Sequence, residues 1–231
     1  MVLTCTSLKG VKDVQRAYSN NDERCVLRVL PVIVIDFENL YTESEASRDL
    51  LVECDNKYNA YIECVASKVA SNGESRPDCE EIAKDYEECR RKFVEQAVIC
   101  GTYNPEDNSI IVFARCIAVS AGLKPSKEQL VQRFIQVVAH ELIHYAQYNG
   151  LRRLLGVEIR EDMNSERHEK YLKLPYRMRP HEIEAYEKMD YVAKRIEECG
   201  IEDILNLAAW FAYEMCNRLN ALSPRPMCSE E

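Results

Sequence analysis

Four cysteines constrain the fold of this 231-residue chain more than any other feature of its sequence. Cys54 and Cys64 are separated by nine residues, and so are Cys79 and Cys89. Apolar residues repeat at helical spacing around each pair, and the polar stretch 71–77 between them predicts a turn. Two helices joined by a short loop form an antiparallel hairpin, in which facing positions have a constant sum of residue numbers. Cys54 with Cys89 and Cys64 with Cys79 satisfy this condition at the same time.

This segment, roughly residues 48–96, resembles the twin Cys-x9-Cys helical hairpins of the coiled-coil-helix-coiled-coil-helix family. The resemblance rests on the four cysteines and the helix pattern. It implies two disulfide bonds, Cys54–Cys89 and Cys64–Cys79. The alternative is four buried free thiols on amphipathic helices.

The remaining cysteines suggest further pairs, but no Cys-x-x-Cys motif occurs that would indicate a zinc ribbon or redox pair. The total of 11 is odd, so at least one thiol stays free or bonds to another chain. The pairs suggested by position in the sequence are Cys199 with Cys216, Cys5 with Cys25, and Cys100 with Cys116.

Composition limits the partners of the chain. Lys and Arg total 30 against 39 Asp and Glu, and the formal net charge of -9 argues against nucleic acid as a partner. No apolar run is long enough to span a bilayer, and Met1 to Val14 lack the apolar core of a signal peptide. Disulfide bonds without a signal peptide favour the cytoplasm of a hyperthermophile. The alternatives are a virion, an intermembrane space or another oxidising compartment.

The predicted fold is α+β and mostly helical. A buried strand is expected at Cys25–Phe37 and a short apolar strand at Ser109–Ala114. Residues 101–108 are predicted to be turn-rich, and residues 151–175 irregular. Helices are predicted from the N-cap Ser126 to about Gln147, from Pro180 to Cys199 and Gly200, and from about Ile201 to Leu222. The predicted organisation is one compact unit with four parts. They are an N-terminal strand region (1–45), the hairpin (46–98), a core (99–222) and a flexible tail (223–231).

The chemistry is indicated by the sequence His140-Glu141-Leu142-Ile143-His144, which is an HExxH motif within the first of these helices. Two histidines four residues apart lie on one helix face, where both imidazoles can bind a single Zn²⁺. The glutamate between them lies beside the open metal position and can take a proton from the bound water. Short motifs occur by chance, and the alternative is a surface helix with two solvated histidines.

From about Gly101 to Glu198 the chain resembles a zincin metallopeptidase of the gluzincin type. The matching features are a Gly-x-Tyr…Asn-x-Ile strand entry, the HExxH helix and a later Pro-x-Glu-x-Glu-Ala helix. The resemblance implies a small β-sheet packed on the HExxH helix, with Ser109–Ala114 as the edge strand that binds extended substrate. Metzincins are less similar, because positions 147 and 150 hold Gln and Gly instead of the Gly and His of their longer motif.

The resemblance also implies a third metal ligand on the downstream helix. The family pattern Glu-x-x-Ala selects Glu182, because Ala185 follows at the right offset. Glu184 is the first alternative and His181 the second, since three histidines can also hold zinc. Tyr186 stands where a carboxylate that orients a histidine would be expected, so the orienting residues stay unassigned.

These residues predict a zinc metalloendopeptidase that binds one Zn²⁺ and hydrolyses a peptide or protein substrate, with Glu141 activating the water. Tyr186 and Tyr176 are candidate donors to the developing oxyanion, as are His181 and Tyr145. A peptidase acting on one dedicated protein has the same sequence features. The alternative from another class is a non-catalytic zinc-binding or structural protein, for example in a virion, with a degenerate zincin fold. The oligomeric state is left open.

Overall fold

The computed structural model describes residues 25, 27, 29–37, 45–70, 79–95, 100–163, 165–221 and 228. Helices predominate over strands, as predicted, and the sheets are small. The chain divides into two compact units. The sheet unit comprises Met1–Asp36, Gly101–Val112 and Ile135–Asn206, and the hairpin unit comprises Phe37–Cys100, Phe113–Phe134 and Leu207–Glu231. No helix in the described ranges is both long and apolar enough to cross a membrane.

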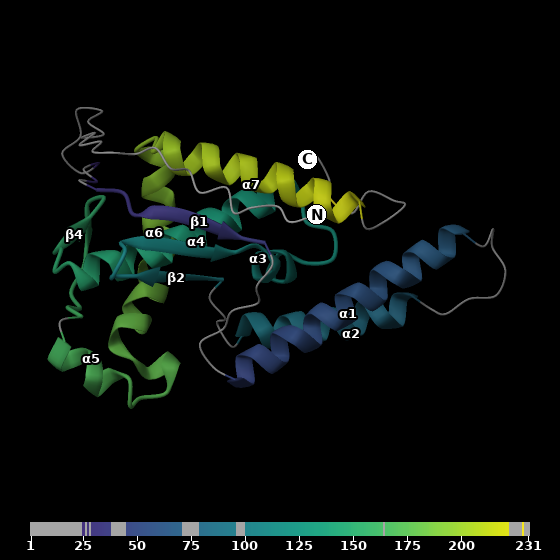
Figure 1. The fold of residues 1–231 in the computed structure, drawn as a ribbon, viewed down its shortest axis with the longest axis horizontal. Coiled ribbons are helices and arrows are strands. Elements are labelled where there is room, and N and C mark those ends of the chain that lie inside the picture. The colour runs from purple at the N-terminus through teal and green to yellow at the C-terminus, as the bar shows by residue number, and fades with distance from the viewer. Residues whose placement is uncertain are drawn as a thin grey trace. The chain divides into compact units, whose positions relative to one another are not determined.

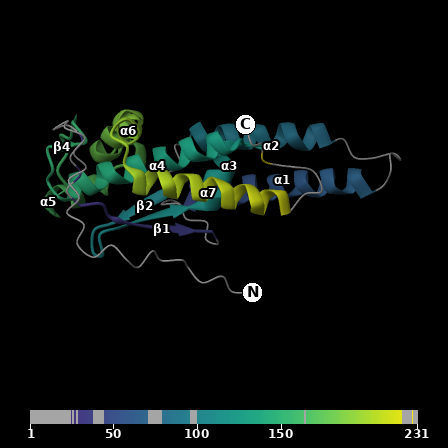
Figure 2. The same ribbon diagram turned by 90° about the horizontal axis from the view of Figure 1, so that it is seen from above.

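The hairpin unit contains the predicted pair of helices. Helices α1 (Glu45–Ala70) and α2 (Cys79–Glu95) lie side by side in both views of the ribbon (Figures 1 and 2). Both predicted disulfide bonds between them, Cys54–Cys89 and Cys64–Cys79, are present. The register predicted from the residue numbers is therefore confirmed. All four cysteines are buried, so the bonds lie along the seam between the helices.

Helix α3 (Ala114–Ala121) completes this part of the hairpin unit and was not predicted from the sequence. Its eight residues are too few for a clear helical period, and its apolar composition reads as a continuation of the preceding strand. Tyr86 of α2 donates a buried hydrogen bond to the carbonyl of Val119 at 2.9 Å. The predicted bond Cys100–Cys116 is confirmed.

The other two disulfide bonds differ from the predicted pairs. Cys25 is bonded to Cys199, and Cys216 to Cys228, so the predicted pairs Cys199–Cys216 and Cys5–Cys25 are wrong. Both errors arise because Cys25 and Cys199, which are 174 residues apart in the sequence, bond to each other and are not available to the predicted partners. Cys5 lies outside the described residues.

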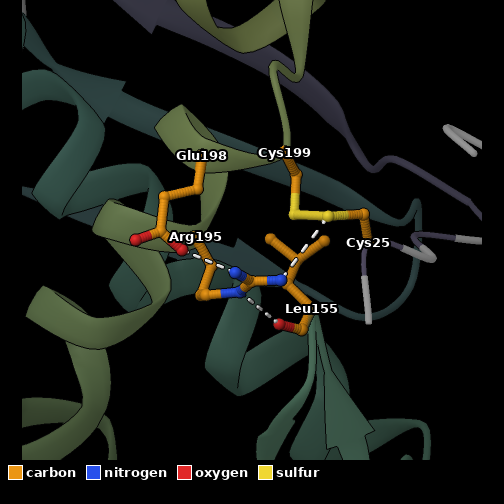
Figure 3. The surroundings of a disulfide bond; sticks show 5 residues. All are labelled: Cys25, Leu155, Arg195, Glu198 and Cys199. Atoms are coloured by element: carbon orange, nitrogen blue, oxygen red, sulfur yellow. Dashed lines mark hydrogen bonds and ion pairs between the residues drawn. A yellow bond between two sulfur atoms is a disulfide. The ribbon is translucent and has the colours of Figure 1, made fainter. Parts of the chain in front are cut away.

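The Cys25–Cys199 bond connects the segment before the sheet to the end of a helix (Figure 3). The guanidinium of Arg195 contacts this bond, with Nη2 3.5 Å from the sulfur of Cys25. Its other nitrogens are held by Glu198 and by the carbonyl of Leu155. The bond therefore fixes the C-terminal end of helix α6 (Pro180–Glu198) within the sheet unit.

The sheet unit contains a three-stranded sheet in the order β1-β3-β2. Its strands are β1 (Val32–Asp36), β2 (Gly101–Asn104) and β3 (Ser109–Phe113). Strands β2 and β3 are antiparallel, with Gly101 opposite Val112. The predicted edge strand Ser109–Ala114 is thus the central strand, and that expectation is wrong. The reason is that β2, in a stretch predicted to be turn-rich, forms its own strand beside it; only 105–108 form the turn.

Helices α4 (Lys127–Tyr148) and α6 (Pro180–Glu198) carry the motif residues, and their predicted bounds are confirmed within one or two residues. Ser126 and Gln129 form a reciprocal capping pair at the start of α4, with N–H to side-chain oxygen distances of 2.9 and 3.1 Å. Pro180 occupies the first turn of α6, where its missing N–H costs nothing. Helix α7 (Glu202–Ala221) follows α6, also as predicted.

Residues 151–175 were predicted to be irregular, but they contain short elements, and a further one follows directly after them. They are β4 (Arg153–Leu154), β5 (Val157–Glu158), α5 (Ser165–Tyr171) and the 3-10 turn η2 (Tyr176–Met178). The hairpin β4–β5 turns at Leu155 and Gly156, which have φ of 49° and 82°. Two positive φ values in a two-residue loop match the right-handed twist of a hairpin. Such short elements leave no readable period in the sequence.

The hydrophobic core of each unit is built from separate apolar sets. In the sheet unit the fully buried side chains include Ile110, Leu142, Ile143 and Leu154. In the hairpin unit they include Tyr86, Phe93, Phe134 and Phe211. The first set lies partly on α4 next to the histidines, so the motif helix is held rigidly where it carries the polar residues.

Candidate metal centre

Three buried ligand atoms converge in the sheet unit from two helices. His140 and His144 lie one turn apart on α4, and their Nε2 atoms are 3.0 Å from each other. Oε2 of Glu182, in the first turn of α6, is 3.4 Å from each of these nitrogens. The three residues are at most 7% exposed. They form the one group of potential ligands found among the described residues, and this group can hold a metal ion.

The spacing of the three atoms fits a small tetrahedral ion. Ligands about 2.0–2.1 Å from a tetrahedral Zn²⁺ are about 3.3–3.4 Å apart. The observed separations of 3.0, 3.4 and 3.4 Å lie close to that value. By contrast, ordinary N–H···O hydrogen bonds are about 2.7–3.2 Å long, so the carboxylate contacts are spaced more like ligands of one ion. Two imidazoles and one carboxylate are also a donor set that zinc accepts.

The local charges are coupled. Burial lowers the pKa of His144, but the charge of Glu182 and close contact with it outweigh burial, and the pKa rises to about 9. Burial raises the pKa of Glu182, but the charge of His144 and the ring nitrogens of all three histidines hold it well below its usual range. Without a metal ion His144 therefore carries a proton at neutral pH. A bound metal would take the place of that proton.

Glu141 lies between the two histidines and against the sheet. Its residue is 2% exposed. A Cβ added at Gly101 of β2 would lie 2.8 Å from Val137 Cγ1, 3.0 Å from Glu141 Cγ and 3.2 Å from its Oε1. Only glycine allows the strand to approach the helix this closely. The Gly-x-Tyr of the strand entry therefore has a steric role next to the motif glutamate.

Glu184, the first alternative ligand, does not belong to the group of converging ligand atoms. Its carboxylate accepts hydrogen bonds from four donors instead. Lys188 and the backbone N–H groups of residues 160 and 161 lie 2.5–2.9 Å from it. Burial raises the pKa of Glu184, but these donors outweigh it and the pKa is lowered. This glutamate holds the chain at residues 160 and 161 onto α6.

Gln147 is the site residue that sequence reasoning missed. It is fully buried on α4, one turn after His144. Its Oε1 lies 2.8 Å from Nδ1 of His144, and its Nε2 donates to the carbonyl of His181 and to Glu184. The signal available in the sequence was an amide at three residues after the second histidine, on the same helix face. That signal was used only to exclude a metzincin.

The other predicted residues are placed as follows. His181 is buried, and its Nε2 lies 3.3 Å from Oε1 of Glu182. The other oxygen of Glu182, Oε2, is the one that contacts His140 and His144. The ring of Tyr186 is edge-on to His140 with centroids 4.9 Å apart, which brings this predicted oxyanion donor to the site. Tyr176 lies in η2, and the guanidinium of Arg179 lies over its ring, 5.4 Å from the centroid. Tyr145 packs on Tyr103.

Comparisons with protein-family models, with curated proteins and with solved structures find no match to this chain.

Proposed function

We propose that the chain is a zinc-dependent metallopeptidase of the zincin type, in which His140, His144 and Glu182 hold one Zn²⁺. The observation that carries the proposal is the buried triangle of two imidazole nitrogens and one carboxylate oxygen beside Glu141. When bound there, zinc would supply a Lewis acid that polarises a carbonyl and makes a water molecule acidic near neutral pH.

The number of protein ligands favours catalysis over a structural role. Structural zinc sites are closed by four protein ligands, whereas catalytic sites keep a position open. Among the described residues the ligand group contains three members and no fourth. His181 has the chemistry of a fourth ligand, but its Nε2 contacts the second oxygen of Glu182. It is better placed to orient that carboxylate than to close the site.

Glu141 is the proposed general base. It follows His140 directly on α4 and is buried, so a water held at the open position would meet its carboxylate in a site screened from solvent. Glu141 accepts a proton from the attacking water and returns it to the leaving amine. Tyr186, next to His140, is the proposed donor to the oxyanion that forms on the attacked carbonyl.

Among the described strands β2 is at an edge of the sheet, and this edge is the proposed binding site for the substrate backbone. The N–H of Phe113 donates to the carbonyl of Cys100 at 2.7 Å, which makes 100 and 113 a hydrogen-bonded pair. In an antiparallel ladder such pairs alternate, so Gly101 and Tyr103 direct their backbone groups away from β3. The side-chain direction of Gly101 points at Glu141, since a Cβ added there would lie 3.0 Å from Glu141 Cγ. A peptide added as a strand there would lie against the proposed base, which favours a peptide substrate.

The proposal is tested by the substitution Glu141→Gln in the full chain with its disulfide bonds intact and zinc added. Cleavage of an unfolded protein substrate, such as reduced and alkylated casein, is expected to be abolished, because the amide cannot take a proton. Zinc content is expected to stay at one ion per chain, because Glu141 is not a ligand.

The matched control is Glu128→Gln, on the exposed first turn of the same helix. This variant is expected to cleave at the wild-type rate. Cleavage by Glu141→Gln at the wild-type rate would contradict the assigned base, and a wild-type chain that binds no zinc would contradict the proposal as a whole.

A further inference from the structure

Gln147 occupies the centre of a buried polar network that the HExxH motif does not explain. Its side chain makes three hydrogen bonds: Oε1 with His144, and Nε2 with the His181 carbonyl and with Glu184. The distances are 2.8, 3.0 and 3.1 Å, and the residue has no exposed surface. Three of the four hydrogen bonds that a side-chain amide can make are therefore formed.

The neighbours of Gln147 determine which end of the amide faces which partner. A backbone carbonyl and a carboxylate can only accept hydrogen bonds, so the group that faces both must be the NH₂. The amide oxygen is then left to face His144. An oxygen can only accept, so Nδ1 of His144 must be the donor and carry a hydrogen. With Nδ1 protonated, the lone pair of a neutral imidazole is on Nε2, which is the atom that faces His140 and Glu182.

Glu184 in turn fixes the orientation of the amide. One of its oxygens accepts from the N–H of Arg160 and from Lys188, and the other from the N–H of Glu161 and from Gln147. With four donors around it this carboxylate cannot turn without losing hydrogen bonds, each of which contributes more when buried. The backbone carbonyl of Gln147 also accepts from the N–H of Met163 at 3.0 Å. The loop at 160–163 and helix α6 therefore hold the amide from two sides.

We infer that Gln147, anchored by Glu184, is a positioning residue that fixes the Nδ1-protonated tautomer and the ring orientation of His144 for metal binding. This inference rests on the proposed metal site. It assigns a neutral amide to the task for which sequence reasoning expected a carboxylate, and it gives Glu184 a role one step behind the ligands. Residues that orient metal-bound histidines typically contribute about 10–100-fold to metal affinity.

The test uses Gln147→Met, because methionine has a similar length but lacks the amide groups. Zinc affinity of the full chain is measured by competition with a chromophoric chelator, and it is expected to fall about 10–100-fold. The matched control is Gln136→Met on the same helix. Gln136 also links α4 to α6, through Asp190 at 3.0 Å, but it is only partly buried and lies one turn before His140, on the far side of the motif from Gln147. Its zinc affinity is expected to stay within about twofold of wild type.

A spectroscopic measurement separates positioning from general loss of packing. In the zinc-loaded wild type, ¹H–¹⁵N spectra of the histidine rings are expected to show a slowly exchanging proton on Nδ1 of His144. This proton is expected to exchange rapidly in Gln147→Met and slowly in Gln136→Met. Slow exchange that persists in Gln147→Met would overturn the inference.

The outcomes distinguish this inference from the proposed function. If the wild type binds zinc and Gln147→Met binds it equally tightly, the positioning role is wrong and the metal site stands. If the wild type binds no zinc, the proposed function fails and the inference fails with it. If Gln147→Met and Gln136→Met lose affinity equally, the effect is loss of packing between helices, and the positioning role is wrong.

Discussion

The α1–α2 hairpin and the candidate metal centre show two ways of holding a pair of helices in register. In the hairpin, two covalent bonds at Cys54–Cys89 and Cys64–Cys79 join the helices. In the metal centre, α4 and α6 are joined by polar side chains that meet at one point. The hairpin needs only the correct spacing of four identical residues. The centre needs different residues from distant segments, each with its own protonation state and orientation.

The largest expected effect comes from removing a ligand from the centre. In His144→Ala the chain is expected to lose stoichiometric zinc, because two ligand atoms remain where three converged. The bound metal is counted by native mass spectrometry after dialysis. His181→Ala serves as the control and is expected to keep one zinc ion per chain. Equal loss in both variants would mean that His181 is a ligand too, and that the three-ligand centre is incorrectly assigned.

The next largest effect comes from opening the hairpin. Cys54→Ser with Cys89→Ser is expected to lower the free energy of unfolding by about 2–4 kcal/mol, because the unfolded chain regains the freedom of a 35-residue loop. Removing Cys64–Cys79, which closes 15 residues, is expected to cost about 0.8 kcal/mol less. Chemical denaturation monitored by circular dichroism measures both. Zinc affinity is expected to be unchanged. A loss of zinc on opening the hairpin would contradict the claim that the two regions are held independently.

The two regions differ in whether their contacts are encoded by local sequence spacing, and this explains how far the sequence could predict each. Cysteine spacing carries the register of the hairpin directly, and the Pro180 and Ser126 signals carry the starts of α6 and α4. The pairing Cys25–Cys199 could not be predicted, because it depends on where the segment before β1 meets the end of α6 in space. The same holds for β2, whose position beside α4 depends on the absence of a side chain at Gly101.

Within the site, the HExxH motif predicted two ligands and the base candidate, but it could not choose the third ligand from geometry. Glu182 and Glu184 are two residues apart on one helix and both are buried. One contacts the histidines and the other contacts Lys188 and two backbone N–H groups. A burial pattern alone cannot separate them, because their difference depends on what other segments bring to each carboxylate.

A smaller and pH-dependent effect follows from the raised pKa of His144. Since this pKa is about 9 without a metal, zinc has to displace a proton at any lower pH. Apparent zinc affinity is therefore expected to fall about tenfold, or about 1.4 kcal/mol, for each pH unit below 9. The stability of the zinc-free chain changes in the opposite direction. The protonated histidine stabilises the fold fully below its unfolded pKa of 6.5, and this contribution is lost as pH rises through 9.

The measurement is a zinc titration at several pH values, together with denaturation of the chelator-treated chain at the same values. The hairpin disulfide bonds do not titrate, so their contribution to the free energy of unfolding is expected to stay constant across this pH range. A zinc affinity that does not change between pH 6.5 and 9 would contradict the proton displacement at His144.

The smallest expected effect concerns an ion pair of the hairpin unit. Asp55 of α1 pairs with Arg115 of α3, and the side chains are 14% and 39% exposed. Asp55→Asn is expected to lower the free energy of unfolding by about 1 kcal/mol or less, because solvent screens the pair. Glu53→Gln, which removes the more exposed pair with Lys57, is expected to have a still smaller effect. A larger loss of unfolding free energy for Glu53→Gln than for Asp55→Asn would mean that the exposed pair within α1 stabilises the helix more than its pair with α3.

The identity of the third ligand is the central claim of this account, and the zinc content of matched variants tests it most directly. Wild type, Glu182→Gln and Glu184→Gln are saturated with zinc, dialysed, and measured by metal analysis as full chains with intact disulfide bonds. Wild type and Glu184→Gln are expected to retain one zinc ion per chain, and Glu182→Gln none. A wild type without stoichiometric zinc, or a Glu182→Gln variant that retains it, would contradict the account.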